Sequence, residues 1–237
     1  MNNWIKYWDK ENIISDNIWI KNNLYFYKNS LDIIDYFDED IVIDIGSGKG
    51  FFAELIVNKV KELYLIDTSK NSINFCKKKF KKYNNVFFNV LDPEDYTNFD
   101  FMKTRPNKIF VISVIQYYKS LSDVKALIHN CKKISNPNNG VLFIADIPLD
   151  NNMLKDVFNI MYSSVILGTF FDTILFFMKS FFGNYRKTRN TINIRTYSII
   201  ELQDLLEEMN LNYKIYKGIT NVKGRISILI NFNNKTI

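Results

Sequence analysis

Ten residues from Ile41 to Gly50 place the strongest constraint on the fold of this chain of 237 residues. Ile41 to Ile45 is a β-branched run with one acid, which is typical of a buried parallel strand. Glycines follow at positions 46, 48 and 50; lacking a Cβ, they tolerate positive φ and let another molecule approach the backbone. Helical spacing of apolar residues comes next, at Phe52, Leu55, Ile56 and Val60. The order of strand, glycine turn and helix predicts a nucleotide-binding turn in an open α/β sheet.

A second apolar run supports a nucleoside ligand. Leu63 to Ile66 predicts a strand that ends in Asp67, 21 residues beyond Gly46. In dinucleotide-binding folds an acid about 20 residues beyond the first glycine accepts hydrogen bonds from the ribose hydroxyls. The sequence therefore predicts a nucleoside with a free 2′-hydroxyl, although a purely structural tight turn is the alternative for the glycines.

The spacing of the glycines argues against two common phosphate ligands. A pyrophosphate-binding fingerprint has its third glycine one residue later than Gly50. Lys49 lacks both the four-residue spacer before it and the Ser or Thr after it that a P-loop requires. NAD and nucleoside triphosphates are thus disfavoured.

The stretch from Val42 to Gly50, followed by Asp67, resembles the first motifs of class I S-adenosylmethionine-dependent methyltransferases. The resemblance implies an α/β fold of the Rossmann-like, doubly wound kind. Its seven-stranded sheet would be mostly parallel, with an antiparallel last strand. S-adenosyl-L-methionine would be the cofactor. The residues that would contact it in this part of the chain are Asp44, Gly46, Ser47, Gly48, Gly50, Asp67 and Thr68.

The end of the third predicted strand, Val86 to Val90, matches the family's adenine site in part. In the family an acid here accepts a hydrogen bond from the adenine amino group, and the next backbone N–H meets a ring nitrogen. Asp92 fits the first role, whereas Pro93 has no N–H, so the second contact comes from Glu94 or is absent. The alternative is that Asp92 is a turn residue before proline.

A hexapeptide from Ser113 to Tyr118 follows the fourth predicted strand, residues 109–113, and resembles a motif of small-molecule methyltransferases. The resemblance implies that Ser113 lies at the methionine part of the cofactor and that Gln116 and Tyr117 hold the acceptor. The Asn/Asp-Pro-Pro-aromatic tetrad of enzymes that methylate base amino groups is not found here, which counts against a nucleic-acid substrate. A loop that merely packs on the domain is the alternative.

Asp146 follows the fifth predicted strand, Val141 to Ala145, at the edge of the sheet where substrate would bind. One acid does not make a metal site, so no metal is predicted. At the other end of the chain, residues 1–30 predict a helical lid, and the resemblance makes Tyr7 and Trp8 candidates for covering cofactor and substrate. A helix packed on the domain is the plainer interpretation.

An apolar insertion follows strand five, over residues 149–194. From Val157 to Met178, 15 of 22 residues are apolar and Asp172 alone is charged, a length compatible with a membrane span. A single crossing would separate the last helix and the closing hairpin, 213–216 and 225–232, from their own sheet. Gly168 and Asp172 suggest a break into two helices. We expect a cap over the acceptor pocket or a homodimer face, with an in-plane membrane contact as the alternative.

Composition narrows the remaining possibilities. The net charge is +6, but lysine is spread along the chain, and the cluster from Lys77 to Lys82 suits the end of a helix better than a nucleic-acid patch. Cys76 and Cys131 lie on apolar stripes and are expected to be reduced core thiols. The single histidine, His129, lies off its helix stripe and is not expected to be catalytic. Without a signal sequence, a cytoplasmic protein is expected.

These observations predict a single methyltransferase domain over residues 1–237. It would move a methyl group from S-adenosylmethionine to a small-molecule acceptor by in-line displacement, which needs positioning more than acid-base chemistry. Two alternatives stay open. One is a non-catalytic nucleotide-binding or membrane-associated module with the same fold, and the other is an RNA methyltransferase, which the basic pI of about 9.0 favours.

Overall fold

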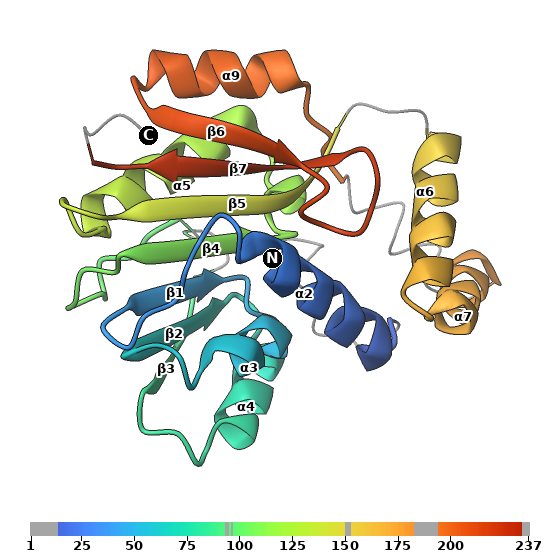
Figure 1. Ribbon diagram of the computed structural model, residues 1–237, viewed down its shortest axis with the longest axis horizontal. Coiled ribbons are helices and arrows are strands. Elements are labelled where there is room, and N and C mark those ends of the chain that lie inside the picture. Colours follow the sequence, from blue (N-terminus) through green and yellow to red (C-terminus); the bar gives the residue numbers. More distant parts are fainter. Residues whose placement is uncertain (1–13, 93–94, 96, 150–152, 183–193, 234–237) are drawn as a thin grey trace.

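The computed structural model describes residues 14–92, 95, 97–149, 153–182 and 194–233. Its centre is a seven-stranded sheet in the order β3-β2-β1-β4-β5-β7-β6, with helices on both faces (Figure 1). The strands are β1 (Ile41–Ile45), β2 (Glu62–Asp67), β3 (Val86–Val90), β4 (Lys108–Ile112), β5 (Val141–Pro148), β6 (Asn212–Lys217) and β7 (Arg225–Asn231). The predicted seven-stranded Rossmann-like sheet is confirmed.

Strand directions decide which edge of the sheet carries the site. Strands β1 to β5 pair in parallel, whereas β7 is antiparallel to both β5 and β6. The order reverses beside β1, which pairs with β2 on one side and β4 on the other. Ligands of open α/β sheets bind outside the carboxyl ends of the strands at this switch point. The loop from β6 to β7 reaches the same edge, since Arg225 pairs with Pro148 at the end of β5.

Helices cover the sheet through two hydrophobic clusters. One face is covered by α2 (Asp16–Ser30), α3 (Phe51–Ile56) and α4 (Lys70–Lys79), and the other by α5 (Leu121–Ile134) and α9 (Ile199–Glu208). Serine side chains cap the amino ends of α4, α5 and α9, and Ser120 forms a full capping box with Asp123. These serines fix the helix starts because they accept hydrogen bonds from otherwise unpaired backbone N–H groups.

Helix α2 belongs to the core of the domain. Phe26 is 1% exposed and meets Phe52 edge-on, with ring centroids 5.4 Å apart. Phe110 of β4 and Phe143 of β5 complete this aromatic group. The described part of the predicted lid thus packs on the sheet, while Tyr7 and Trp8 lie outside the described residues.

Two further helices, α6 (Met153–Ile166) and α7 (Phe170–Phe182), stand beside the sheet at the right of Figure 1. Gly168 separates them with a φ of +69°, so the predicted break in the apolar stretch is confirmed. No helix among the described residues is long and apolar enough to cross a membrane. The lid and cap assignments, and the single-domain boundary, stay predictions.

The polarity of α6 and α7 is reversed relative to an ordinary surface helix. The buried described side chains of the two helices and of the turn between them are polar, namely Asn159, Ser163, Ser164, Thr169 and Thr173. Phe171 is 81% exposed, and other apolar side chains also face outward. A dimer face or membrane contact through residues 157–178 stays a prediction.

Several expected boundaries differ from the structure. Strand β5 continues beyond Ala145 to Pro148 and so includes Asp146, with its pairing to β7 shifted between Ile144 and Ile147. Helix α3 ends at Ile56 although apolar spacing continues to Val60. The Asn85 amide donates to the carbonyls of Val57 and Val60, each at 3.0 Å, and holds this segment as a turn. Strand β4 ends at Ile112 because Ser113 takes a φ of +58°, which breaks the extended backbone.

Candidate active site

All three glycines of the turn after β1 have positive φ, but their surroundings differ. A Cβ on Gly46 would lie 2.3 Å from Cγ2 of Val114, and one on Gly50 would lie 2.6 Å from Cε2 of Phe80. Packing therefore requires glycine at both positions. A Cβ on Gly48, whose φ is +52°, would meet nothing within 4 Å. Gly48 thus borders open space at the carboxyl end of β1, where a ligand can approach the backbone.

The carboxylate of Asp67 ties this turn to β2. It accepts hydrogen bonds from the N–H groups of Gly48 and Ser69, both at 2.8 Å. The Ile66 carbonyl accepts from the Gly46 N–H at 2.7 Å. Ser47 adds a buried hydroxyl that has no partner among the described residues. These hydrogen bonds hold the turn in place beside the open space at Gly48.

Asp44 lies beneath the turn and is only 3% exposed. Burial, and then the negative charge of Asp67, raises the pKa of its carboxyl from 3.8 to about 7. Both causes disfavour the ionised form. Near neutral pH the Asp44 carboxyl is therefore partly protonated in the folded protein and ionised in the unfolded chain.

This raised pKa predicts a pH-dependent stability. Between pH 3.8 and about 7 the folded state binds one more proton than the unfolded state. The stabilisation from that proton is complete below pH 3.8 and is lost as the pH rises through about 7. We expect the unfolding free energy of the parent, relative to Asp44→Asn, to fall by at most about 1.4 kcal/mol per pH unit. Urea denaturation of both proteins from pH 5 to 9 measures this, and a constant difference would contradict the shift.

A second polar group lies at the ends of β4 and β5. Oδ2 of Asp146 accepts hydrogen bonds from Oγ of Ser113 and from Nη1 of Arg225, both at 2.5 Å. The Arg225 and Asp146 side chains are 18% and 13% exposed. Ser113 and Asp146 also have positive φ, +58° and +63°. Such strained non-glycine residues cluster at functional sites, where the surrounding structure holds them in place. We call this trio the Asp146 cluster.

The short helix η1 (Ile115–Tyr117) follows Ser113. Burial raises the pKa of Tyr117 to about 12, with the nearby charge of Arg225 opposing the shift. Gln116 is 5% exposed, and its Oε1 has no partner among the described residues. The Gln116 carbonyl accepts from the N–H of Arg195 at 2.8 Å, and that of Ile115 accepts from the Tyr197 hydroxyl at 2.7 Å. The segment after α7 thus returns to anchor η1.

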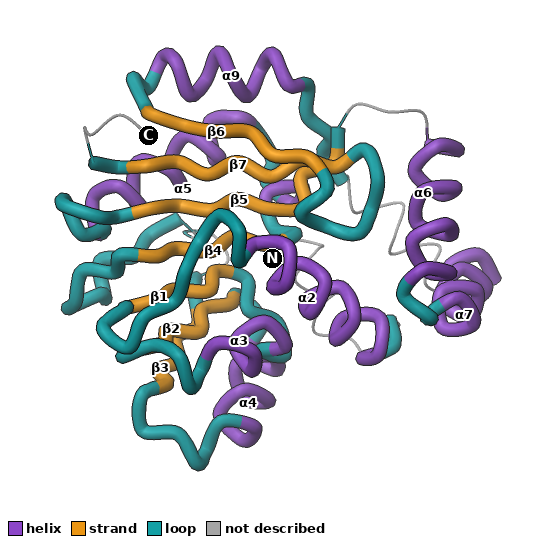
Figure 2. The backbone as a smooth tube through the Cα atoms, viewed as in Figure 1, coloured by secondary structure: helices purple, strands orange, loops and turns teal. Residues whose placement is uncertain are grey.

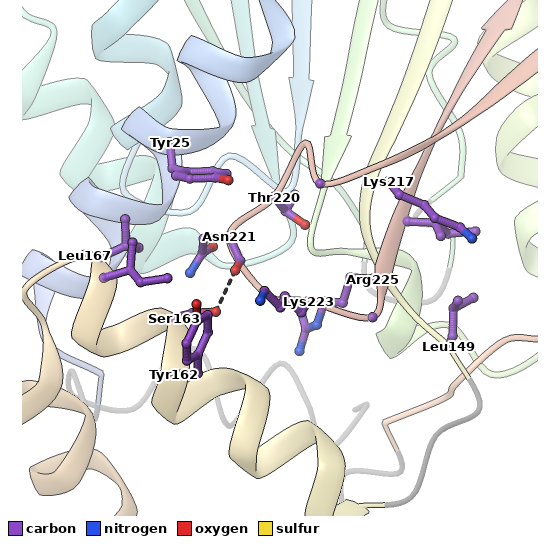
Figure 3. A pocket seen from close by; sticks show the side chains of 14 residues that line it. Tyr25, Leu149, Tyr162, Ser163, Leu167, Lys217, Thr220, Asn221, Lys223 and Arg225 are labelled. Atoms are coloured by element: carbon purple, nitrogen blue, oxygen red, sulfur yellow. Dashed lines mark hydrogen bonds between the residues drawn. The ribbon is translucent and has the colours of Figure 1, made fainter.

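A cavity of about 410 Å³ opens between α2, α6 and the loop from β6 to β7 (Figure 3). Figure 2 shows that loop reaching toward α6. The lining residues are Tyr25, Leu149, Tyr162, Ser163, Ile166, Leu167, Lys217, Gly218, Thr220, Asn221, Lys223, Gly224, Arg225 and Ile226. Because Arg225 belongs to both, the cavity lies directly beside the Asp146 cluster.

The predicted site residues gather at one edge of the sheet. Those of the glycine turn, with Asp67 and Thr68, follow β1 and β2, and Asp92 is exposed after β3. Ser113 follows β4, Asp146 lies within the last part of β5, and their side chains form a hydrogen bond. Pro93, Tyr7 and Trp8 lie outside the described residues. Gln116, Tyr117 and Asp146 do not line the cavity, although Asp146 contacts it through Arg225.

Sequence reasoning missed Arg225, whose partner Asp146 is 79 residues away. It also missed Thr220 and Lys223 in the hairpin loop and Tyr25 on α2. No local motif marks these positions, because the β5–β7 register and the packing of α6 bring them together.

As expected from their sequence positions, both cysteines are free and buried. Among the described residues, no group of three His, Cys, Asp or Glu side chains has the geometry of a metal site.

Comparison with known proteins identifies the family. A family model described as a methyltransferase domain matches residues 26–214, which is most of the chain. This protein belongs to the methyltransferase domain family. The resemblance of its glycine turn to class I S-adenosylmethionine-dependent methyltransferases is thereby confirmed. The sequence matched no curated protein.

Solved structures share the fold of this methyltransferase at low sequence identity. The N-methyltransferase NodS from Bradyrhizobium japonicum WM9, in complex with S-adenosyl-L-homocysteine, is 15% identical with a TM-score of 0.54, over 88% of this chain and 84% of that one. An O-methyltransferase family 2 protein from Planctomyces limnophilus, in complex with apigenin, is 12% identical with a TM-score of 0.55, over 86% and 56%. A putative methyltransferase from Haloferax volcanii, in complex with the Trm112 activator, is 11% identical with a TM-score of 0.61, over 91% and 92%.

Proposed function

We propose that this methyltransferase uses S-adenosylmethionine to methylate a small-molecule acceptor by in-line displacement. The observation that carries the proposal is the open space at Gly48, whose N–H donates to the Asp67 carboxylate. This space lies at the switch point of the sheet, where such folds bind nucleotides. A complex of the similarly folded NodS with S-adenosylhomocysteine supports the same class of cofactor.

The residues present fit the cofactor's chemical groups. Asp67 would accept hydrogen bonds from the two ribose hydroxyls, and Asp92 would accept one from the adenine amino group. Asp44 and Ser113 would face the methionine part, where a positively charged amino group suits a carboxylate. Ser47, Thr68 and the backbone of Gly46 and Gly48 would complete the contacts. Pro93 offers no N–H, so adenine recognition through the backbone falls to Glu94 or is absent.

S-adenosylmethionine supplies a methyl group on a positively charged sulfonium, which needs no metal or nucleophilic side chain to be transferred. The protein's task is to hold the acceptor atom in line with that group and to exclude water. Positioning of this kind is worth up to about 7 to 11 kcal/mol. The Asp146 cluster suits such positioning, because its hydrogen bonds and strained backbone fix it between the glycine turn and the cavity.

A small acceptor is favoured by the cavity volume of about 410 Å³, which lies within the usual range for small-molecule sites. The similarly folded Planctomyces protein was solved with apigenin, a small molecule.

We further propose that residues 1–237 form one domain, that 1–30 with Tyr7 and Trp8 act as a lid, and that 149–194 act as a cap. Gln116 and Tyr117 would support the acceptor site from η1, and a cytoplasmic location is proposed.

Replacement of Asp67 tests the cofactor assignment. Asp67→Ala should weaken binding of S-adenosylhomocysteine by roughly 1.5 to 3 kcal/mol, the range for hydrogen bonds to a charged group. Isothermal titration calorimetry of parent and variant measures the difference. Because Asp67 also holds the Gly48 and Ser69 N–H groups, circular dichroism should accompany the titration. Equal affinities, or tight binding of NAD by the parent, would refute the assignment.

The same protein distinguishes the alternative functions. Tight binding of S-adenosylhomocysteine without methyl transfer to any small acceptor would favour a non-catalytic module. RNA binding that falls steeply with added salt would favour an RNA methyltransferase.

A further inference from the structure

We infer that the cavity between α6 and the β6–β7 hairpin binds an acceptor that carries an anionic group, a carboxylate or a phosphate, on an apolar body. Calling the bound molecule an acceptor rests on the proposed methyl transfer. The preference for an anion with an apolar body rests on the cavity alone.

The charge of the cavity wall is one-sided. Three cationic side chains line it, Lys217, Lys223 and Arg225, and no carboxylate is among the lining residues. All three come from the hairpin, opposite α6 (Figure 3). Arg225 forms an ion pair with Asp146, so its charge is largely offset. The two lysines keep a net positive charge that an anionic group would neutralise.

A buried hydroxyl on the same wall also calls for a ligand. Thr220 is 8% exposed, and its Oγ1 has no hydrogen-bond partner among the described residues. Buried polar atoms in folded proteins nearly always have a partner, and an orphaned one at a cavity is explained by a missing ligand or water. An oxygen of a carboxylate or phosphate would accept the Thr220 O–H. The hydroxyl and the cations therefore favour the same chemical group.

Apolar side chains also line the cavity. Ile166 at the end of α6, the following Leu167, Leu149 and Ile226 are among the lining residues, and the Tyr25 ring comes from α2. Apolar side chains form no hydrogen bonds with water, so displacement of water from them by an apolar part of the ligand would be favourable. A bare inorganic anion would contact only the cationic and hydroxyl groups and not the apolar lining.

The cavity is built before any ligand binds. The Asn159 amide of α6 donates to the Lys223 carbonyl at 2.7 Å, and the Ser163 hydroxyl donates to the Asn221 carbonyl at 2.6 Å. The Lys223 ammonium also lies 4.2 Å from the centre of the Tyr162 ring. These contacts hold the hairpin loop against α6, and a preformed site loses less entropy on binding.

Adjoining contacts connect this cavity with the glycine turn. Arg225 donates to Asp146, which accepts from Ser113, and the next residue, Val114, packs so closely on Gly46 that a Cβ there would clash. An acceptor held by its anionic group in this cavity would therefore lie next to the residues that lead to the proposed cofactor turn.

Four probes of equal chain length test the inference: octanoate, octyl phosphate, octanamide and octanol. Calorimetric titration into protein saturated with S-adenosylhomocysteine should show both anions binding at least tenfold more tightly than the two neutral compounds. Lys223 is exposed, so Lys223→Gln should fold normally. This variant should bind the anions at least fivefold more weakly and the neutral compounds unchanged. The control Lys81→Gln, which removes an exposed charge beyond α4, should match the parent.

Neutral probes that bind as tightly as the anions, or an unaffected Lys223→Gln variant, would overturn the inference. An equal loss in Lys81→Gln would do the same, because it would show that net charge rather than the cavity attracts the anion. Preference for octanoate or octyl phosphate would say which anionic group the acceptor carries. Repeating the titrations without S-adenosylhomocysteine separates the two proposals. Failure of the cofactor to bind refutes the methyltransferase function, whereas loss of anion preference refutes the acceptor class.

Discussion

A Gly48→Val variant is expected to lose measurable binding of S-adenosylhomocysteine while keeping the parent's fold. A Cβ at this position would meet no protein atom within 4 Å, so a branched side chain would enter the space that we assign to the cofactor. Gly46 and Gly50 cannot serve for this test, because side chains there would collide with Val114 and Phe80. Calorimetry measures the binding, and far-ultraviolet circular dichroism checks the fold.

Valine at a positive φ carries its own cost, and the chain offers a matched control for it. Gly168, between α6 and α7, has a φ of +69°, and a Cβ there would likewise have nothing within 4 Å. Gly168→Val should therefore suffer a similar backbone strain of about 1 to 2 kcal/mol without any loss of cofactor binding. If Gly48→Val binds as the parent does, or if Gly168→Val fails equally, the open space at Gly48 is not the cofactor site.

Asp146→Ala should cause the largest loss of stability among substitutions at the site. It would leave the Arg225 guanidinium, 18% exposed, without its carboxylate. Breaking one side of a buried pair costs about 3 to 5 kcal/mol, and we expect about 3 kcal/mol here because the pair is not fully buried. Chemical denaturation of parent and variant measures the loss.

Two comparisons make this second prediction specific. The ion pair between Lys125 and Glu208 is exposed, with side chains 45% and 64% accessible, so Glu208→Ala should cost less than about 1 kcal/mol. Adding Arg225→Met to Asp146→Ala should restore part of the stability, since the guanidinium charge would be removed together with its carboxylate. A double variant no more stable than Asp146→Ala would show that the loss comes from backbone strain at position 146 instead.

The parts of the site that the sequence predicts are those encoded in one continuous stretch. The glycine turn follows from Ile41 to Gly50, and Asp67 follows from its distance to Gly46. Each contact there joins neighbouring βα units, whose geometry is nearly the same in every open α/β sheet. Ser113 and Asp146 were predicted in the same way, from their positions at the ends of two predicted strands, although β5 continues to Pro148 and so includes Asp146.

The acceptor side was predictable only in outline. The apolar insertion indicated that this segment is unusual. It did not indicate that polar side chains of α6 and α7 would face the body of the protein. Arg225 lies at the start of a strand, and only the β5–β7 register places it beside Asp146. Lys49 illustrates the same limit within the glycine turn. Its spacing excludes a P-loop, but only the structure shows that it pairs with Asp16 of α2 at 2.8 Å and so anchors the helix that covers the sheet.

The polar attachment of α6 bears on how such an enzyme changes its specificity. Asn159 and Ser163 bind backbone carbonyls of the hairpin, and no described side chain of α6 or α7 belongs to either hydrophobic cluster of the sheet. Backbone carbonyls are the same whatever residue carries them, so the hairpin side chains at positions 221 and 223 can be exchanged without disturbing these bonds. The chain thus separates a cofactor half, fixed by the packing of the sheet, from an exchangeable acceptor half. Divergence toward new acceptors, or redesign in the laboratory, can proceed in the second half while the first keeps the domain folded.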